Sequence, residues 1–192
     1  IPTVSLTLDI QLPPGRGLGS SATAIVAGLC AANEWQENPL PKEDLLNLAI
    51  TLEGHPDNVA PALLGGCLIN LEVNTQYQTI SVPVSDSLVW ILCIPDIEFS
   101  THHARSVLPK AVSMEVCVFN MSRIATLIAG LYTQDKEKIA WGLHDRLHQP
   151  YRQSLIPGMK EVCSAAMNVG ALGCVLSGAG PTLLALTTDY SK

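Results

Sequence analysis

The chain is poor in charge and in aromatic side chains. Of its 192 residues 15% are charged and 5% are aromatic, whereas 47% are hydrophobic, so aliphatic residues and alanine must fill the core. Only 11 basic residues stand against 17 acidic ones, and the net charge of −6 argues against nucleic acid or an anionic membrane as the main partner. We also expect no membrane span, because Asp, Asn, Pro or Gly interrupts each apolar run.

Metal and disulfide patterns are absent as well. The six cysteines contain no Cys-x-x-Cys pair and sit in apolar runs, which predicts reduced, buried thiols and a cytoplasmic protein. The chain has no initiator methionine. It opens with Ile1-Pro2 in an alternating apolar run that predicts a strand over residues 4–12, so we expect an internal fragment.

The most informative segment reads Leu12-Pro-Pro-Gly-Arg-Gly-Leu-Gly-Ser-Ser-Ala-Thr-Ala24. Alternating glycines let the backbone adopt positive φ and bring its N–H groups against a ligand. The apolar helix that follows adds free N–H donors and a positive dipole end, which together favour a polyanion. We therefore predict that residues 13–22, the glycine loop, cradle phosphate. Ser20 and Ser21 are expected to cap the helix or to reach a phosphate or its metal.

Two common phosphate-binding patterns do not fit the glycine loop. A Walker A loop ends in Gly-Lys-Ser/Thr, and no lysine occurs between Gly15 and Lys42. A dinucleotide fingerprint needs a third glycine where this chain has Ser20. A plain glycine turn before a core helix is the remaining structural alternative.

A second polar cluster lies in Glu53-Gly-His-Pro-Asp-Asn-Val-Ala-Pro61. Two carboxylates, an imidazole and an amide occur within six residues, between Gly and Pro residues that fix a turn. The simpler interpretation is that Asp57 caps a helix beginning at Asn58 and that His55 lies on the surface.

Two arginine segments and a second glycine turn follow. Arg105 stands in Phe99-Ser-Thr-His-His-Ala-Arg105, and Arg152 in Asp145-Arg-Leu-His-Gln-Pro-Tyr-Arg152. The planar guanidinium suits a carboxylate ligand, although an arginine on a helix surface needs no ligand at all. Ser177-Gly-Ala-Gly-Pro181, the closing loop, follows a predicted strand and permits positive φ.

These segments together resemble the GHMP small-molecule kinases. The glycine loop resembles their Pro-x-x-x-Gly-Leu-Gly-Ser-Ser-Ala phosphate loop, and the closing loop resembles their third motif. His55-x-Asp-Asn-x-x-Pro61 and both arginine segments are similar to the homoserine kinases within the family. The resemblance implies an α+β GHMP kinase fold with a ribosomal protein S5 domain 2-like N-terminal half, incomplete at its start, and a ferredoxin-like C-terminal half. We place these domains at residues 1–85 and 86–192.

The resemblance also implies ATP-dependent phosphorylation of the L-homoserine hydroxyl, with ATP and Mg²⁺ as cofactors and a homodimer as the family's typical assembly. It assigns the ATP phosphates to Pro13, Pro14, Gly15, Arg16, Gly17, Leu18, Gly19, Ser20, Ser21 and Ala22; Mg²⁺ to Ser20, Ser21 and Glu53; the substrate to His55, Asn58, Thr101, Arg105 and Arg152; catalysis to Asn58 and Asp57; and site closure to Ser177, Gly178 and Gly180.

Some alternatives stay open. Glu53 stands only two residues before His55, closer than in many homoserine kinases, and Asp57 is either a general base or none is needed. A sibling kinase for another alcohol, a non-catalytic amino-acid or nucleotide sensor, and an inert fragment are the competing functions.

Periodicity and turn residues predict mixed helices and strands. In the second helix Leu45, Leu48, Ala49 and Leu52 are expected to form the buried stripe, and Gly54 to end it. The expected helices are 20–35, 41–53, 59–64, 101–107, 115–132, 135–147 and 157–169, and the further strands 66–72, 78–82, 88–94, 172–177 and 182–187.

Overall fold

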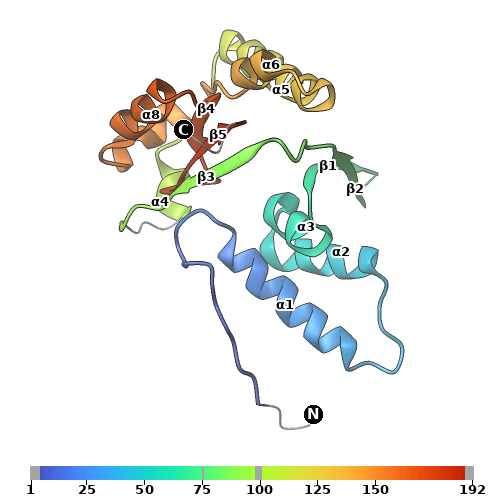
Figure 1. Cartoon of the computed structure of the whole chain (residues 1–192). Coiled ribbons are helices and arrows are strands. Elements are labelled where there is room, and N and C mark those ends of the chain that lie inside the picture. Colours follow the sequence, from blue (N-terminus) through green and yellow to red (C-terminus); the bar gives the residue numbers. More distant parts are fainter. Residues whose placement is uncertain (1–4, 75, 98–100, 189–192) are drawn as a thin grey trace.

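A computed structural model describes residues 5–74, 76–97 and 101–188, without the side chains of residues 101 and 102. Figure 1 shows a group of three helices at one end and a sheet with its covering helices at the other. The elements in chain order are α1 (Ser20–Glu34), α2 (Lys42–Glu53), α3 (Pro56–Leu64), β1 (Cys67–Val73), β2 (Gln76–Val82), β3 (Val89–Cys93), α4 (Thr101–Ser106), α5 (Met114–Thr133), α6 (Lys136–Gly142), α7 (Gln149–Arg152), the 3₁₀ turn η1 (Gln153–Leu155), α8 (Met159–Asn168), β4 (Gly173–Leu176) and β5 (Leu183–Thr187).

Helices α1, α2 and α3 pack around a small aliphatic core. Its fully or nearly buried members include Ala22 and Val26 of α1. Helix α2 ends as predicted at Gly54, whose φ of 89° is left-handed. The predicted stripe on α2 is confirmed for Leu45 and Ala49, which are buried, but is wrong for Leu48 and Leu52. Leu46 and Ile50 face the core, whereas Leu48 and Leu52 are 43% and 64% exposed.

The second core surrounds a three-stranded antiparallel sheet in the order β3-β5-β4. Helix α8 packs on β4 and β5, and α5 packs on α6. Glycines permit this last contact. A Cβ at Gly142 would lie 2.5 Å from Leu127 Cα, and one at Gly130 would lie 2.7 Å from Ile139 N. Small residues therefore set the separation of α5 and α6.

Strands β1 and β2 form a separate antiparallel hairpin, from Cys67 opposite Val82 to Val73 opposite Gln76. Val82 and Leu88 pack with Leu131 and Leu186 of the second core, so the hairpin adjoins both groups. The mixed α+β content is as predicted. The division of the chain at residue 85 stays a prediction.

The N-terminal segment departs from its sequence pattern. Residues 5–12 form no strand, and residue 4 lies outside the described residues. Leu6, Leu8 and Ile10 are 75%, 73% and 69% exposed, and Figure 1 shows the segment running away from α1. The predicted strand is wrong here because a strand forms only where a neighbour satisfies its backbone groups, and no other described strand pairs with it.

Two helix predictions also need correction. Helix α6 ends at Gly142, well before the expected residue 147, and a short helix, α7, follows it. Within the described chain, α5 is long and apolar enough to meet the length and composition criterion for a membrane span, contrary to the expectation above. Its Asn120 and Gly130 do not break the run as assumed. The criterion is weak, since core helices of water-soluble proteins satisfy it too.

Candidate functional site

The glycine loop adopts the backbone that its sequence predicts. Gly15, Gly17 and Gly19 have φ of 68°, 75° and 75°, and α1 begins immediately afterwards at Ser20. Gly19 is the N-cap, so Ser20 and Ser21 occupy the first turn and provide no side-chain cap. The expectation that they cap the helix is therefore wrong. Backbone N–H groups in that turn have no partner within the helix itself.

Ser21 of the first turn meets Glu53 at the end of α2. The Ser21 Oγ donates to Glu53 Oε2 across 3.0 Å, although the residues are far apart in sequence. Asn58 approaches the same turn, because a Cβ at Gly19 would lie 3.6 Å from Asn58 Oδ1. Hydroxyl and carboxylate oxygens are the hard ligands that Mg²⁺ prefers, so this pair fits the ion.

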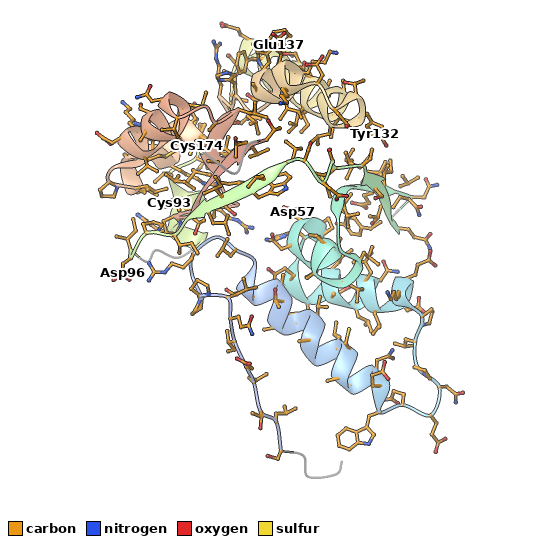
Figure 2. All side chains as sticks on the ribbon, viewed as in Figure 1. Asp57, Cys93, Asp96, Tyr132, Glu137 and Cys174 are labelled. Carbon is orange, nitrogen blue, oxygen red and sulfur yellow. The ribbon has the colours of Figure 1, made fainter. Side chains whose placement is uncertain are left out.

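The His55-Pro56-Asp57-Asn58 turn opens α3. The helix begins at Pro56 rather than at Asn58, with His55 as its N-cap and no side-chain cap, so Asp57 does not cap it. Figure 2 shows Asp57 at this end of α3, and its side chain is 75% exposed. His55 is more engaged, since its Nε2 lies 2.9 Å from Arg105 Nη2. A guanidinium only donates, so His55 Nε2 is the acceptor.

Arg152 is nearly buried, with 8% of its surface exposed. Its Nε donates to Ala104 O at 3.0 Å, and its Nη1 donates to His148 Nδ1 at 3.1 Å and to Gly178 O at 3.4 Å. Burial is the largest cause of a lowered pKa for Arg152. The positive charge of Arg105 lowers that pKa further, against the pull of Asp145.

Arg105 and Arg152 thus repel each other across a shared site. Among the residues that the structure describes, neither forms an ion pair with a carboxylate. Two like charges held close together without a counterion favour binding of an anion. Thr101 begins α4, which carries Arg105, but the Thr101 side chain and residues 98–100 lie outside the described set.

The closing loop contacts the backbone of the glycine loop. Ser177 Oγ donates to Gly17 O at 2.8 Å, and Thr182 N donates to Arg16 O at 3.2 Å. Gly178 and Gly180 have φ of 56° and 86°, as the turn requires. The two loops therefore lie against each other, and the Gly178 carbonyl also accepts from Arg152 Nη1. That Ser177, Gly178 and Gly180 close the site stays a prediction.

Comparison with known proteins decides the family. The profile described as GHMP kinases N terminal domain matches residues 2–66, and the profile described as GHMP kinases C terminal matches residues 127–192. The chain belongs to the GHMP kinase family. Homoserine kinases of Gloeobacter violaceus and Prochlorococcus marinus subsp. pastoris are 50% and 52% identical to it, over 97% and 93% of this chain and 62% and 57% of their own lengths.

A solved structure supports the same family assignment. The crystal structure of a homoserine kinase from Cytophaga hutchinsonii matches with a TM-score of 0.88 at 36% identity, over 95% of this chain and 59% of that one. The predicted GHMP kinase fold is thereby confirmed. The chain spans about three fifths of the length of the curated relatives that it matches.

No motif in the sequence singled out the residues that support Arg152. Asp145 accepts from the N–H groups of Leu147, His148 and Gln149 at 2.9, 2.9 and 2.7 Å, and from Asn120 Nδ2 at 2.6 Å. Burial acts to raise the Asp145 pKa, but these hydrogen bonds outweigh it and the pKa is lowered. The signal was an aspartate five residues before Pro150, since an Asp side chain readily accepts hydrogen bonds from N–H groups a few residues ahead in a turn.

Two further sets of contacts hold the elements around the site together. Gln149 Oε1 accepts from Leu176 N at 3.0 Å, which joins α7 to the strand entering the closing loop. The Arg16 guanidinium donates to the carbonyl groups of Pro95 and Ile97 and pairs with Asp96 at 3.0 Å. The Arg16 side chain thus anchors the glycine loop to the segment after β3.

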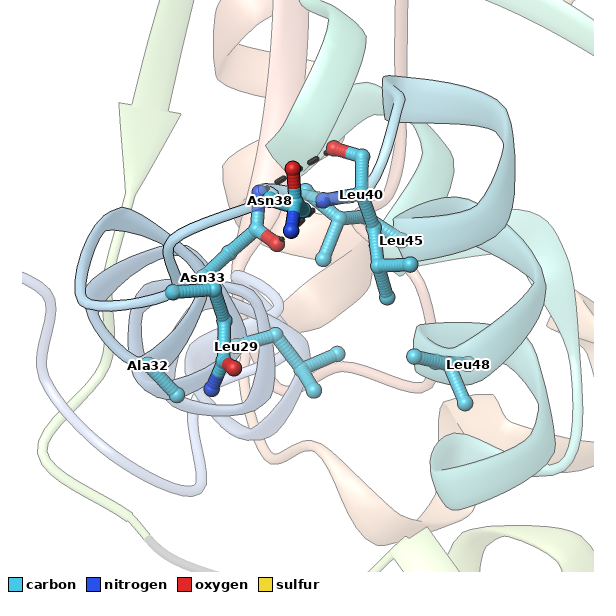
Figure 3. A pocket seen from close by; sticks show the side chains of 8 residues that line it. Leu29, Ala32, Asn33, Asn38, Leu40, Leu45 and Leu48 are labelled. Carbon is cyan, nitrogen blue, oxygen red and sulfur yellow. Dashed lines mark hydrogen bonds between the residues drawn. The ribbon is translucent and has the colours of Figure 1, made fainter.

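Two cavities in the structure lie away from these site residues. One, of about 270 Å³, opens between the end of α1 and the start of α2 (Figure 3), and another of about 190 Å³ lies beside α6. The side chains that line them include none of the predicted site residues. Over residues 5–74, 76–97 and 101–188, no group of three His, Cys, Asp or Glu side chains forms a metal site.

Proposed function

We propose that the protein carrying this chain phosphorylates the terminal hydroxyl of L-homoserine with ATP, giving O-phospho-L-homoserine for threonine biosynthesis. The observation that carries the proposal is the pair Arg105 and Arg152, which form no ion pair with a carboxylate among the described residues and are joined to the glycine loop through His55, Asn58 and the closing loop. An α-carboxylate matches that charge. The relatives named homoserine kinase support the same choice.

In the proposed reaction the chain's own groups bind and orient the two substrates. Arg105 and Arg152 hold the amino-acid carboxylate, and the N–H groups of the glycine loop hold the phosphates of ATP. Asn58, beside Gly19, orients the acceptor hydroxyl toward the γ-phosphoryl group. Phosphoryl transfer depends mainly on such in-line positioning and on charge stabilisation, which this arrangement supplies.

Ser21 and Glu53 would hold Mg²⁺, whose charge, when the ion is bound, offsets the negative charge of the phosphates. Asp57 is exposed at the start of α3, and its carboxylate is the candidate general base, the group that would remove the proton of the acceptor hydroxyl. An Asp57→Asn variant with near-normal kcat would show that positioning alone suffices.

We also propose a cytoplasmic location. All six cysteines are free, and a reducing compartment keeps thiols in that state.

The experiment compares acceptors with the purified protein and ATP. We expect ADP release with L-homoserine and little with mevalonate or with L-homoserinamide, whose neutral amide replaces the carboxylate. Turnover of mevalonate as fast as of L-homoserine would contradict the substrate assignment. Binding of L-homoserine without ADP release would indicate an amino-acid sensor, and activity on the amide equal to that on L-homoserine would exclude the arginine clamp.

A further inference from the structure

His148 lies between Asp145 and Arg152. Its Nδ1 is 3.1 Å from Arg152 Nη1, and its Nε2 is 3.8 Å from Asp145 Oδ2. Because a guanidinium has no lone pair to offer, Nδ1 must accept, and the ring proton then sits on Nε2. The imidazole in this contact is therefore neutral and in one tautomer.

The surroundings favour that neutral form. Burial is the largest cause of a lowered pKa for His148, and the charge of Arg152 lowers it further, whereas Asp145 acts to raise it. Asp145 is itself fixed by Asn120 and by the N–H groups at the start of α7, including that of His148. The imidazole is thus held at its backbone and faces a fixed carboxylate.

A neutral acceptor has a specific advantage at this position. A carboxylate on Arg152 Nη1 would pair with the guanidinium and compete with an incoming anion, whereas a neutral imidazole fixes its orientation and adds no negative charge. Arg105 has a partner of the same kind, His55, whose Nε2 accepts from Nη2 at 2.9 Å. Both arginines are therefore oriented by imidazoles.

We propose that His148 is a positioning residue, which holds the Arg152 guanidinium through Nδ1 in the orientation that binds the substrate carboxylate. This inference rests on the proposed function. It assigns His148 no contact with substrate and no proton transfer, so its effect should appear in binding of the amino acid and not in the chemical step.

The kinetic test compares His148→Leu with His148→Asn. The Asn Oδ1 replaces Nδ1 as an acceptor, whereas Leu offers none. Loss of a hydrogen bond to a charged group should raise the KM for L-homoserine about tenfold to a hundredfold in His148→Leu. The KM for ATP should stay unchanged, kcat should change little, and His148→Asn should restore most of the binding. Equal losses in both variants, or a matching rise in the KM for ATP, would overturn the proposal.

A second measurement needs no variant and no substrate. Long-range ¹H–¹⁵N spectra of the unmodified protein at neutral pH should show His148 protonated at Nε2 and bare at Nδ1. A proton on Nδ1 would refute the proposal even if L-homoserine is the substrate. Conversely, the Nε2–H tautomer without turnover of L-homoserine would refute the proposed function and leave the Arg152–His148 contact standing.

Discussion

Replacing Gly17 with alanine should separate the glycine loop from the closing loop. Gly17 has a φ of 75°, and a Cβ there would lie 2.5 Å from Ser177 O and 2.6 Å from Gly180 O. Both neighbours are backbone atoms, which cannot rotate away as the end of a side chain can. A left-handed alanine costs about 1–2 kcal/mol, and forcing atoms into a packed contact adds about 1–3 kcal/mol.

Gly15 provides the matched control. It has a similar φ of 68°, but a Cβ there would meet nothing within 4 Å. Gly15→Ala should therefore carry only the conformational cost, and Gly17→Ala should be less stable by the packing term, about 1–3 kcal/mol. Urea unfolding of both variants measures the difference.

Part of that packing cost will be relieved by local opening of the two loops rather than by global unfolding. The KM for ATP should therefore rise more in Gly17→Ala than in Gly15→Ala, because the loop that we propose to bind the phosphates loses its neighbour. Equal unfolding midpoints together with equal KM values for ATP would refute the contact between Gly17 and the closing loop.

Three further predictions follow from single contacts. Arg105→Ala should raise the KM for L-homoserine by about tenfold or more while the KM for ATP stays constant, and Arg146→Ala, at an exposed arginine outside the site, should change neither. Gly142→Ala should lower the unfolding free energy by about 1–3 kcal/mol because its Cβ would strike Leu127, whereas Gly28→Ala, in open space within α1, should raise it by up to about 1 kcal/mol. Asp145→Asn should reduce stability at neutral pH. Because the folded-state pKa of Asp145 lies below its unfolded value of about 3.9, its contribution is present above about pH 4 and is lost as the pH falls through the folded pKa, so unfolding curves of the variant should depend less on pH below 4.

Local signals in the sequence predicted most of the elements. The start of α1 follows from Gly19 and the apolar run behind it, and the end of α2 follows from Gly54, which adopts the left-handed conformation that its position suggests. These are properties of a few neighbouring residues. The conformations that these residues predict are found in the structure because the tertiary contacts do not oppose them.

Signals that depend on a partner element were less informative. On α2 the apolar residues permit two overlapping stripes, and only packing against α1 and α3 selects the one with Leu46 and Ile50. The alternation over residues 5–12 describes a surface for pairing, but the described residues supply no strand beside it. A hydrophobic pattern shows which side chains of a segment can be buried, but it does not show which element they pack against.

The contacts within the candidate site were also only partly predictable from the sequence. Family resemblance located Arg105 and Arg152, but nothing in their own residue types shows that neutral imidazoles would orient them. Asp145 explains why the missing information is structural: its side chain satisfies three N–H groups of the turn before Arg152. It thereby sets the path of the backbone that carries both His148 and Arg152.

The contact between the glycine loop and the closing loop is especially hard to predict from the sequence, because the glycine loop takes part in it through backbone carbonyls. Ser177 Oγ reaches the Gly17 carbonyl, and Thr182 N reaches the Arg16 carbonyl, so both hydrogen bonds end on backbone oxygens of the glycine loop. The only trace of the contact in the sequence is the missing side chain at Gly17. Because Arg152 donates to Gly178 O in the same closing loop, a shift of that loop changes both the proposed phosphate cradle and the guanidinium proposed to bind the substrate. ATP and amino-acid binding should therefore be coupled through residues 177–182, and a variant that loosens this segment should weaken both, in contrast to one at Arg105.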